Sequence, residues 1–312
     1  MKVYRDYAFS REDFRRPVLT IGSYDGLHRG HQEIIRRVIE RARERDGEAL
    51  MLTFEPHPAK VLRPEQPLPL ITPYRKKVAL LEEMGMDGVI ILPFDEGLSR
   101  MSAEEFIREI IHGKIGPELI IVGYNFTFGH NREGTPSTLR EWGKGLGFEV
   151  EVVSPLKEGP EVVSSTRIRE LITEGKVKEA NSLLGREFLI IGPVVRGKGR
   201  GRGMGFPTAN IEPEQELLPA RGVYAALVSW GEGTRYGVVN IGMRPTFGEE
   251  DLTVEVYVLN YRGDLYGKEL RLGLVDRLRG EKAFSSAEEL SRQIALDKER
   301  AEQILNRYRH GR

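Results

Sequence analysis

The sequence contains no cysteine among its 312 residues. Disulfide bonds, thiolate catalysis, cysteine-ligated zinc and iron–sulfur clusters are therefore excluded. The chain also lacks an apolar run near the ~20 residues that a membrane span needs. Its first residues, 1–13, are too charged for a secretory leader. We expect a soluble, cytoplasmic protein that has no membrane partner.

The sequence also has no net charge. Lysine and arginine together number 47, and so do aspartate and glutamate, so the formal net charge is zero. Such a chain has no bulk attraction for nucleic acid or anionic lipid, and its basic residues must act in small clusters. We therefore expect no nucleic-acid partner. Hydrophobic residues make up 39% and glycines number 35, which is a globular composition.

Two common nucleotide-binding motifs are also missing. No Gly-x-x-x-x-Gly-Lys-[Ser/Thr] occurs, which argues against a P-loop. No Gly-x-Gly-x-x-Gly follows the first predicted strand, which argues against a dinucleotide-binding oxidoreductase.

Apolar runs and helical patterns alternate over the first half of the chain. The apolar runs cover 17–22, 49–54, 89–92, 119–122 and 148–154, and the helical patterns cover about 32–47, 75–85, 102–111 and 166–174. Continuous apolar strands that alternate with helices are typical of a parallel sheet with both faces covered. We predict a Rossmann-like α/β domain over residues 1–184.

The pattern changes near Gly185. Strand-like runs follow at 188–195, 223–230, 236–241, 253–259 and 269–275, and glycine-rich turns separate them. This arrangement predicts an antiparallel barrel or sandwich over residues 185–312. A last helix should run from Ser286 to about Tyr308, and the short helix at 177–184 should connect the two domains.

The segment Ile21-Gly-Ser-Tyr-Asp-Gly-Leu-His-Arg-Gly-His31 follows the first strand and leads into the first helix. Open α/β sheets bind ligands at the carboxyl ends of their strands, and helix N-termini favour phosphate. A helical first turn would project His28 and His31 to one side, with Gly30 leaving room for a phosphate between them. Two histidines can also merely cap a helix, but this pair after a glycine turn favours a phosphate site. Gly22 and Asp25, in that turn, are further candidates for phosphate binding.

A second cluster, Val163-Ser-Ser-Thr-Arg-Ile-Arg169, stands at a loop-to-helix junction. The hydroxyls of Ser165 and Thr166 and the local N–H groups could form an anion nest, and Arg169 could hold phosphate oxygens with both arms. The alternative is an ordinary Ser/Thr helix cap with solvated arginines. The pairing with the histidine motif favours the anion site.

The second half holds the most unusual stretch, Gly197-Lys-Gly-Arg-Gly-Arg-Gly-Met-Gly-Phe-Pro-Thr-Ala-Asn210. Glycines such as Gly205 allow backbone N–H groups to approach a ligand closely. Thr208 and Asn210 lie two residues apart, on one side of an extended segment, and offer the hard oxygens that suit Mg²⁺ bridging phosphates. A solvated Gly/Arg loop that binds RNA is the alternative; the run is short and has no interleaved aromatics.

These residues carry a resemblance in the first half. The His-x-Gly-His and Ser-Ser-Thr-x-x-Arg pair resembles the nucleotidyltransferase superfamily. With residues 22–26, 53–58 and 122–129, the first half is similar to the adenylyltransferase half of prokaryotic FAD synthetases. The resemblance implies that His28 and His31 contact the ATP phosphates and stabilise the transition state. It places Asn125 at the nucleotide and Mg²⁺ site, although many members carry aspartate there. Tyr24 replaces the usual phenylalanine.

The resemblance also implies that Ser165, Thr166 and Arg169 hold the triphosphate. In the second half, Gly205-Phe-Pro-Thr-Ala-Asn210 resembles the riboflavin kinase motif, and residues 240–246, 254–257 and 264–267 follow in the family's order.

For the kinase half, the resemblance implies that Thr208 and Asn210 bind Mg²⁺-ATP. Glu255 would then be the catalytic base that accepts the proton of the riboflavin 5′-hydroxyl. Arg279 matches a position near the flavin.

The two resemblances together imply a bifunctional FAD synthetase that acts on riboflavin, FMN, FAD and ATP with Mg²⁺. Retention of only one activity is an alternative, and so is a nucleotidyltransferase with a different acceptor. An RNA-binding protein that uses the Gly/Arg loop is the non-enzyme alternative. The oligomeric state stays open.

Overall fold

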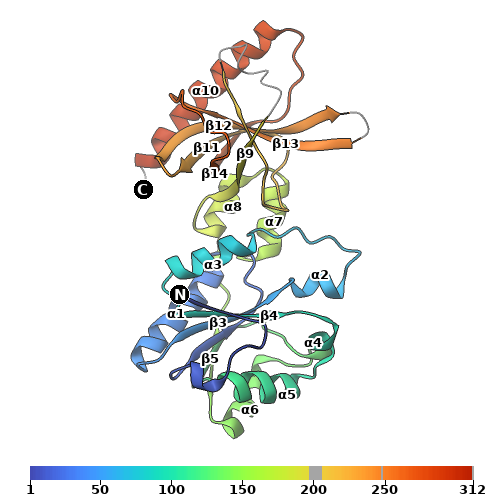
Figure 1. Cartoon of the computed structure of the whole chain (residues 1–312), viewed down its shortest axis with the longest axis vertical. Helices are drawn as coiled ribbons and strands as arrows, with labels where there is room; N and C mark the ends of the chain where they lie inside the picture. Colours follow the sequence, from blue (N-terminus) through green and yellow to red (C-terminus); the bar gives the residue numbers. More distant parts are fainter. Residues whose placement is uncertain (197–205, 247–248, 311–312) are drawn as a thin grey trace. The chain divides into compact units, whose positions relative to one another are not determined.

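The computed structural model describes residues 1–196, 206–246 and 249–310 (Figure 1). Contacts divide the chain into two compact units, Met1–Val163 and Ser164–Arg312. Each unit is described by itself below.

The first unit contains a six-stranded sheet in the order β1-β4-β3-β2-β5-β6. All of its strand pairs are parallel, as the alternation of strands and helices predicts. The N-terminal strand was not predicted, because its sequence is short and charged. The strands are β1 (Lys2–Arg5), β2 (Val18–Ile21), β3 (Ala49–Glu55), β4 (Gly88–Pro93), β5 (Leu119–Gly123) and β6 (Glu149–Val153).

Both faces of this sheet are covered by helices. Successive residues of a strand point to opposite faces, so an apolar strand packs against both layers. In β2, Val18 packs on the face covered by α1 (Arg29–Glu44) and α3 (Tyr74–Glu83). Leu19 packs on the other face, against the π-helix Phe106–Ile115 and α6 (Pro136–Leu146). The uninterrupted apolar strands of the sequence thus supply two cores.

Short elements complete the first unit. The capping box expected from Ser102 to Glu105 is present, and it starts α5, which continues into the π-helix. The α6 helix was not predicted. The remaining elements are 3₁₀ turns at Arg11–Asp13 and His130–Arg132, helices α2 (Pro58–Leu62), α4 (Glu96–Arg100) and α5 (Ala103–Glu105), and the hairpin strands β7 (Lys157–Glu158) and β8 (Glu161–Val162).

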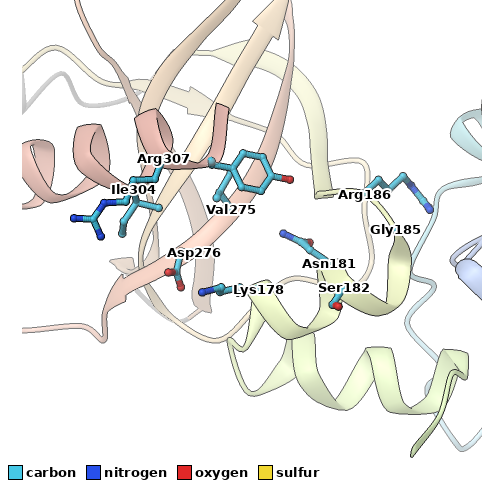
Figure 2. A pocket seen from close by; sticks show the side chains of 10 residues that line it. Lys178, Asn181, Ser182, Gly185, Arg186, Val275, Asp276, Ile304 and Arg307 are labelled. Carbon is cyan, nitrogen blue, oxygen red and sulfur yellow. The ribbon is translucent and has the colours of Figure 1, made fainter. Parts of the chain in front are cut away.

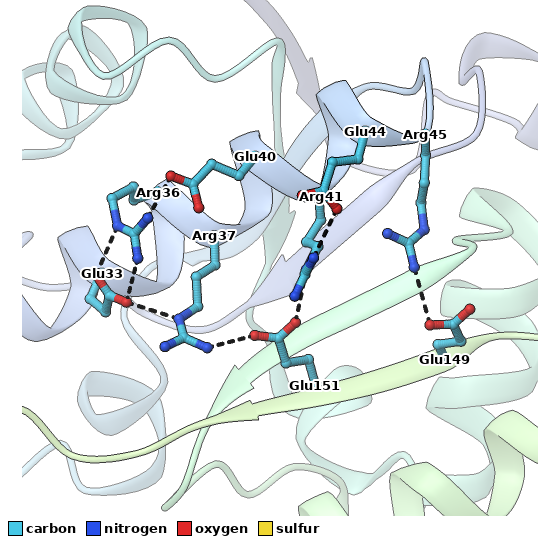
Figure 3. Close-up of polar contacts among 9 residues, drawn as sticks. All are labelled: Glu33, Arg36, Arg37, Glu40, Arg41, Glu44, Arg45, Glu149 and Glu151. Atoms are coloured by element: carbon cyan, nitrogen blue, oxygen red, sulfur yellow. Dashed lines mark hydrogen bonds and ion pairs between the residues drawn. The ribbon is translucent and has the colours of Figure 1, made fainter.

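Ion pairs join the outer side of α1 to the edge strand β6 (Figure 3). Arg37 bridges Glu33 of its own helix and Glu151 of β6, at 2.8 Å to each carboxylate. Arg41 also reaches Glu151, at 3.2 Å. Hydrogen bonds from Arg36 and Arg37 lower the pKa of Glu33 to about 2. These contacts hold the helix whose first turn carries the two histidines.

The second unit is built on a closed antiparallel barrel in the order β10-β13-β12-β11-β14-β9. The structure thus confirms the predicted β domain and shows it to be a barrel. Its strands are β9 (Phe188–Val195), β10 (Ala209–Ile211), β11 (Gly222–Trp230), β12 (Gly233–Thr246), β13 (Glu249–Val258) and β14 (Glu269–Arg279). The last helix, α10 (Ala287–His310), packs Ala301 and Leu305 against Val223 and Leu278 on the outside of the barrel.

Helices α7 (Ser165–Thr173) and α8 (Val177–Leu184) belong to the second unit by contacts. Asn181 of α8 explains why: its amide donates to the carbonyl of Leu274 at 2.7 Å and accepts from the N–H of Phe188 at 2.7 Å. The division by contacts therefore falls before these helices, whereas the sequence-based boundary lies after residue 184.

Candidate active sites

The first candidate site lies where the strand order of the parallel sheet reverses. Strand β2 has β3 on one side and β5 on the other, so the chains that leave β2 and β5 do so at the same edge. Ligands bind at such switch points in open α/β sheets. Asn125 follows β5, and its Oδ1 lies 3.5 Å from the position that a Cβ on Gly123 would take. Ile34 of α1 lies equally close to that position, at 3.5 Å. The exposed Asn125 is thus beside the helix that follows β2.

The two histidines are stacked at the start of α1. Their ring centroids are 3.6 Å apart and the planes differ by 18°. His28 is the N-cap: its Nδ1 accepts a hydrogen bond from the N–H of His31 at 3.3 Å, and only 5% of its surface is exposed. Because this imidazole caps the helix, α1 begins at Arg29, three residues before the predicted start. A Cβ on Gly30 would lie 3.3 Å from the His28 ring, so glycine allows this close packing.

The ring of Tyr24 packs against the second histidine, His31. Its ring meets that of His31 edge-on at 4.8 Å, and its hydroxyl is hydrogen-bonded to Thr20. Thr20 in turn donates to the carbonyl of Ile121 at 2.6 Å, which links β2 to β5. Burial raises the pKa of Tyr24, so the phenol is neutral. A Cβ on Gly22 would lie 2.9 Å from this ring, which accounts for glycine there. The tyrosine that departs from the family pattern is therefore a structural link.

Asp25 anchors the turn before the histidines. Its carboxylate accepts hydrogen bonds from the backbone N–H groups of Ile71, at 3.0 Å, and Thr72, at 3.2 Å. Gly26 follows with φ +87°, a conformation that favours glycine. These contacts give Asp25 a role in shaping the loop, and its contact with nucleotide stays a prediction.

The serine-threonine-arginine cluster begins α7. Ser164 is the N-cap and accepts from the N–H of Arg167 at 3.3 Å. Ser165, Thr166 and Arg169 lie in the first turns of this helix, in the second unit, so their meeting with the histidines stays a prediction. Within the first unit, the carbonyl of Val163, its last residue, lies 3.8 Å from the position of a Cβ on Gly30.

The second candidate site is a row of residues across neighbouring strands of the barrel. Asn210 of β10 pairs with Glu255 of β13, and Glu255 pairs with Asn240 of β12. Asn240 is opposite Val223 of β11, which is opposite Arg279 of β14. Directly opposed residues point to the same face of a sheet. The strand register therefore brings Asn210, Glu255 and Asn240 side by side on one face, although they come from three separate segments of the sequence.

This row lies on the outside of the barrel. The neighbours of these residues along each strand, such as Ile211, Val256 and Val239, are fully or almost fully buried and face inward. Thr208 is described just before β10, whereas Gly205 and the basic loop residues lie outside the described residues. Asn240 was not predicted as a site residue. The sequence feature that could have indicated it is a polar amide between valine and isoleucine in an apolar strand, where both neighbours are buried.

Arg279 is held by the last helix. Its guanidinium forms hydrogen bonds to Asp297 of α10 at 2.8–3.1 Å, and that carboxylate is only 5% exposed. The ring of Phe284 lies 5.6 Å from the guanidinium carbon. Arg279 therefore fastens α10 to β14, and its predicted contact with flavin stays a prediction.

Comparison with known families decides what these two sites belong to. A model of the FAD synthetase family matches residues 10–167, and a model of the riboflavin kinase family matches residues 184–305. The chain belongs to the bifunctional riboflavin kinase/FMN adenylyltransferase family. Its members include the Escherichia coli K12 enzyme, 36% identical over 90% of both chains. The Bacillus subtilis enzyme is 34% identical over 93% of both, and the Pseudomonas fluorescens enzyme is 36% identical over 95% of this chain and 96% of its own.

A solved structure shares the fold over nearly the whole length. It is titled a macrolide-efflux protein from Streptococcus pneumoniae, is 28% identical, and covers 96% of this chain and 98% of its own with a TM-score of 0.86. The efflux in that title is not carried over, because both halves of this chain match flavin-enzyme families. Within the described part of the chain, no helix is long and apolar enough to cross a membrane.

The kinase-family site fits a metal ion that arrives with the nucleotide. Its predicted residues Thr208, Asn210 and Glu255 offer oxygen atoms of a hydroxyl, an amide and a carboxylate, and Asn210 and Glu255 are paired across neighbouring strands. Mg²⁺ is usually held by one or two such groups together with substrate phosphates. Over residues 1–196, 206–246 and 249–310, no group of three or more His, Cys, Asp or Glu is arranged to hold a metal without substrate.

The second unit also has a cavity of about 580 Å³ between α8, β14 and α10 (Figure 2). Lys178, Asp276 and Arg307 line it from these three elements. None of the predicted site residues lines it. This cavity is therefore separate from the polar row on the barrel.

Proposed function

We propose that this chain makes FAD from riboflavin in two ATP-dependent steps, as the names of its relatives imply. The barrel unit transfers the γ-phosphoryl group of ATP to riboflavin and forms FMN and ADP. The parallel-sheet unit then transfers AMP from a second ATP to FMN and releases pyrophosphate. The observation that carries this proposal is the presence of both family matches in one chain, each over a unit that has its own candidate site.

For the adenylyl transfer, an oxygen of the FMN phosphate attacks the α-phosphorus of ATP, and the bond to the pyrophosphate oxygen breaks. The attacking oxygen is already anionic, so no general base is required. In this proposal, the stacked His28 and His31 donate hydrogen bonds to the phosphate oxygens on which negative charge develops. We assign the triphosphate end to Ser165, Thr166 and Arg169, as the resemblance of their motif implies.

For the phosphoryl transfer, the riboflavin 5′-oxygen attacks the γ-phosphorus and ADP leaves. Glu255 accepts the proton of that hydroxyl. Asn210 and Asn240 stand directly opposite Glu255 on the two neighbouring strands, and their amides give the carboxylate polar surroundings. This arrangement keeps the base on a rigid sheet while glycine-rich segments bind the nucleotide.

We further propose that Mg²⁺ is the metal in both steps. Thr208 and Asn210 would hold it in the kinase site and Asn125 would lie beside it in the adenylyltransferase site. When bound, Mg²⁺ neutralises phosphate charge. The domain boundary after residue 184 and the cytoplasmic location also stay predictions; the family matches leave residues 168–183 between them.

A product assay tests the proposal. The full chain is supplied with riboflavin, ATP and Mg²⁺, and the flavins are resolved over time; we expect FMN to appear first and FAD to follow. A parallel reaction supplied with FMN separates the second step from the first. Formation of FMN without FAD would mean that the chain has only the kinase activity. Formation of FAD only from added FMN would mean that it has only the adenylyltransferase activity. Salt-dependent RNA binding without flavin turnover would instead support the RNA-binding alternative.

A further inference from the structure

A buried lysine lies behind the loop that leads to the histidines. Lys77 is on α3 and is only 7% exposed, and it is the only buried lysine among the described residues. Its Nζ donates a hydrogen bond to the carbonyl of Ser23 at 2.7 Å. Burial lowers the pKa of Lys77, whereas Asp25 and Glu55 act in the opposite direction and favour its charged form.

Burying this ammonium is costly unless it is paired. An apolar side chain of similar length would fill the same space without the desolvation cost of a charge. Packing alone therefore does not explain a lysine at this position, whereas its hydrogen bond to the loop does. This hydrogen bond holds the second residue of the turn Gly22–Gly26, whose Ser23 carbonyl also accepts from the hydroxyl of Thr53 at 3.4 Å.

That turn has an unusual backbone. Tyr24 has φ +48°, Gly26 has φ +87° and Leu27 has φ +42°. Non-glycine residues rarely adopt positive φ, and such conformations persist where surrounding contacts determine them. Two contacts do so here: Lys77 fixes the carbonyl before this stretch, and Asp25 fixes the backbone of Ile71 and Thr72.

The turn controls where the histidines lie. His28 follows Leu27 directly and caps α1, and His31 packs against the ring of Tyr24. A shift at Ser23 therefore moves the ring on which His31 rests. The ammonium group donates its hydrogen bond to the backbone of the loop, so it acts on the histidines through that backbone.

We propose that Lys77 is a positioning residue for adenylyl transfer, which holds the Gly22–Gly26 turn in the conformation that presents the stacked histidines to the ATP phosphates. This inference rests on the proposed function of the first unit. It adds a residue on α3 that lies outside every motif of the sequence analysis. The reaction chemistry is unchanged, because Lys77 takes no part in proton or phosphoryl transfer.

The test compares Lys77→Met, Lys77→Arg and the control Lys144→Met in the full chain. Lys144 is an exposed lysine on α6. Conversion of FMN to FAD is measured for kcat and KM, and conversion of riboflavin to FMN is measured in the same preparation. A misplacement near 1 Å can cost about 10²-fold in rate, so we expect about that loss in kcat for FAD formation with Lys77→Met. Riboflavin phosphorylation should stay within about twofold of the unchanged chain, because the barrel does not use this loop.

The conservative variant and a spectroscopic signal separate positioning from packing. Lys77→Arg keeps the charge but moves the hydrogen-bond donor. We therefore expect its kcat for FAD formation to fall by about tenfold, to a value between those of the unchanged chain and Lys77→Met. Proton NMR signals of His28 and His31 should shift in Lys77→Met, because their rings shield one another, while that of His112 stays in place. Lys144→Met should change none of these quantities.

Several results would overturn the inference. Lys77→Met with unchanged FAD formation and unchanged histidine signals but a lower melting temperature would mean that Lys77 only fills space. If Lys77→Met does not fold, Lys77→Arg decides: a tenfold loss supports positioning, and activity equal to that of the unchanged chain rejects it. Failure of the unchanged chain to convert FMN would reject the proposed function itself, while the histidine signals would still report on positioning.

Discussion

The two candidate sites are built in opposite ways. In the parallel sheet, the proposed functional groups stand on a loop after β2 and on the first turn of α1, and buried side chains behind the loop hold that loop. In the barrel, Asn210, Glu255 and Asn240 stand within strands, and the hydrogen-bond register aligns them. A loop site depends on the contacts that fix an unusual backbone, whereas a strand site depends on pairing that the whole barrel maintains. The first should be sensitive to residues that touch no substrate, and the second should be sensitive mainly to the side chains in the row.

The largest effect should come from Glu255, the proposed base in the barrel. We expect Glu255→Ala to lower FMN formation by about 10²–10⁴-fold, the usual contribution of a positioned general base. FAD formation from supplied FMN should be unchanged, because that step uses the other unit. Separate assays of the two steps check this, with the exposed Glu232→Ala as control. Equal loss of both activities would contradict the separation of the sites.

The loop site should respond in the reverse sense. His28→Ala removes both a proposed hydrogen-bond donor and the cap of α1, so we expect FAD formation from FMN to fall by about 10²–10³-fold. Riboflavin phosphorylation should be retained. The control is His112→Ala, in the π-helix of the same unit. Unchanged FAD formation in His28→Ala would show that the histidine role is wrong.

The third effect is on stability and bears on how the barrel row is supported. Asp297→Ala leaves Arg279 without its partner in a largely buried position, so we expect a loss of about 3–5 kcal/mol in the free energy of unfolding of the second unit. Urea unfolding followed by Trp230 fluorescence in a Trp142→Phe background measures it. Glu302→Ala removes a solvent-accessible pair with Lys298 on α10 of the same unit and should cost less than about 1 kcal/mol. Equal costs for the two pairs would mean that burial of Asp297 does not matter.

The smallest effect concerns the ion pairs that hold α1. Glu33 has a pKa lowered to about 2 from 4.5, so its contribution to stability is complete above about pH 4.5 and is lost as the pH falls through about 2. We expect the first unit to lose more stability between about pH 5 and about pH 2 than the Glu33→Gln variant loses. Urea unfolding followed by Trp142 fluorescence in a Trp230→Phe background measures the difference. The exposed Glu12→Gln serves as the control, and identical pH dependence of Glu33→Gln and the unchanged chain would reject the assignment.

What the sequence alone could establish is local. Apolar runs separated by helical patterns predicted the parallel sheet, because the inner strands β2 to β5 are buried on both faces and need no alternation. The His28–His31 spacing and the Thr208–Asn210 pair were visible because each occupies one short segment. The resemblance that these segments carry led to both activities, and the family matches confirm it.

Tertiary structure decided everything that joins distant segments. The row of Asn210, Glu255 and Asn240 exists only through strand register, and no spacing along the chain reveals a register. The hydrogen bond from Lys77 to Ser23 crosses from one helix to a loop after another strand, and a lysine in a helical pattern looks like a surface residue until its burial is known. Motifs show which groups can act, because chemistry is carried by residue type. The fold decides which of them meet and what holds them in place, because distance and burial are properties of the packed chain.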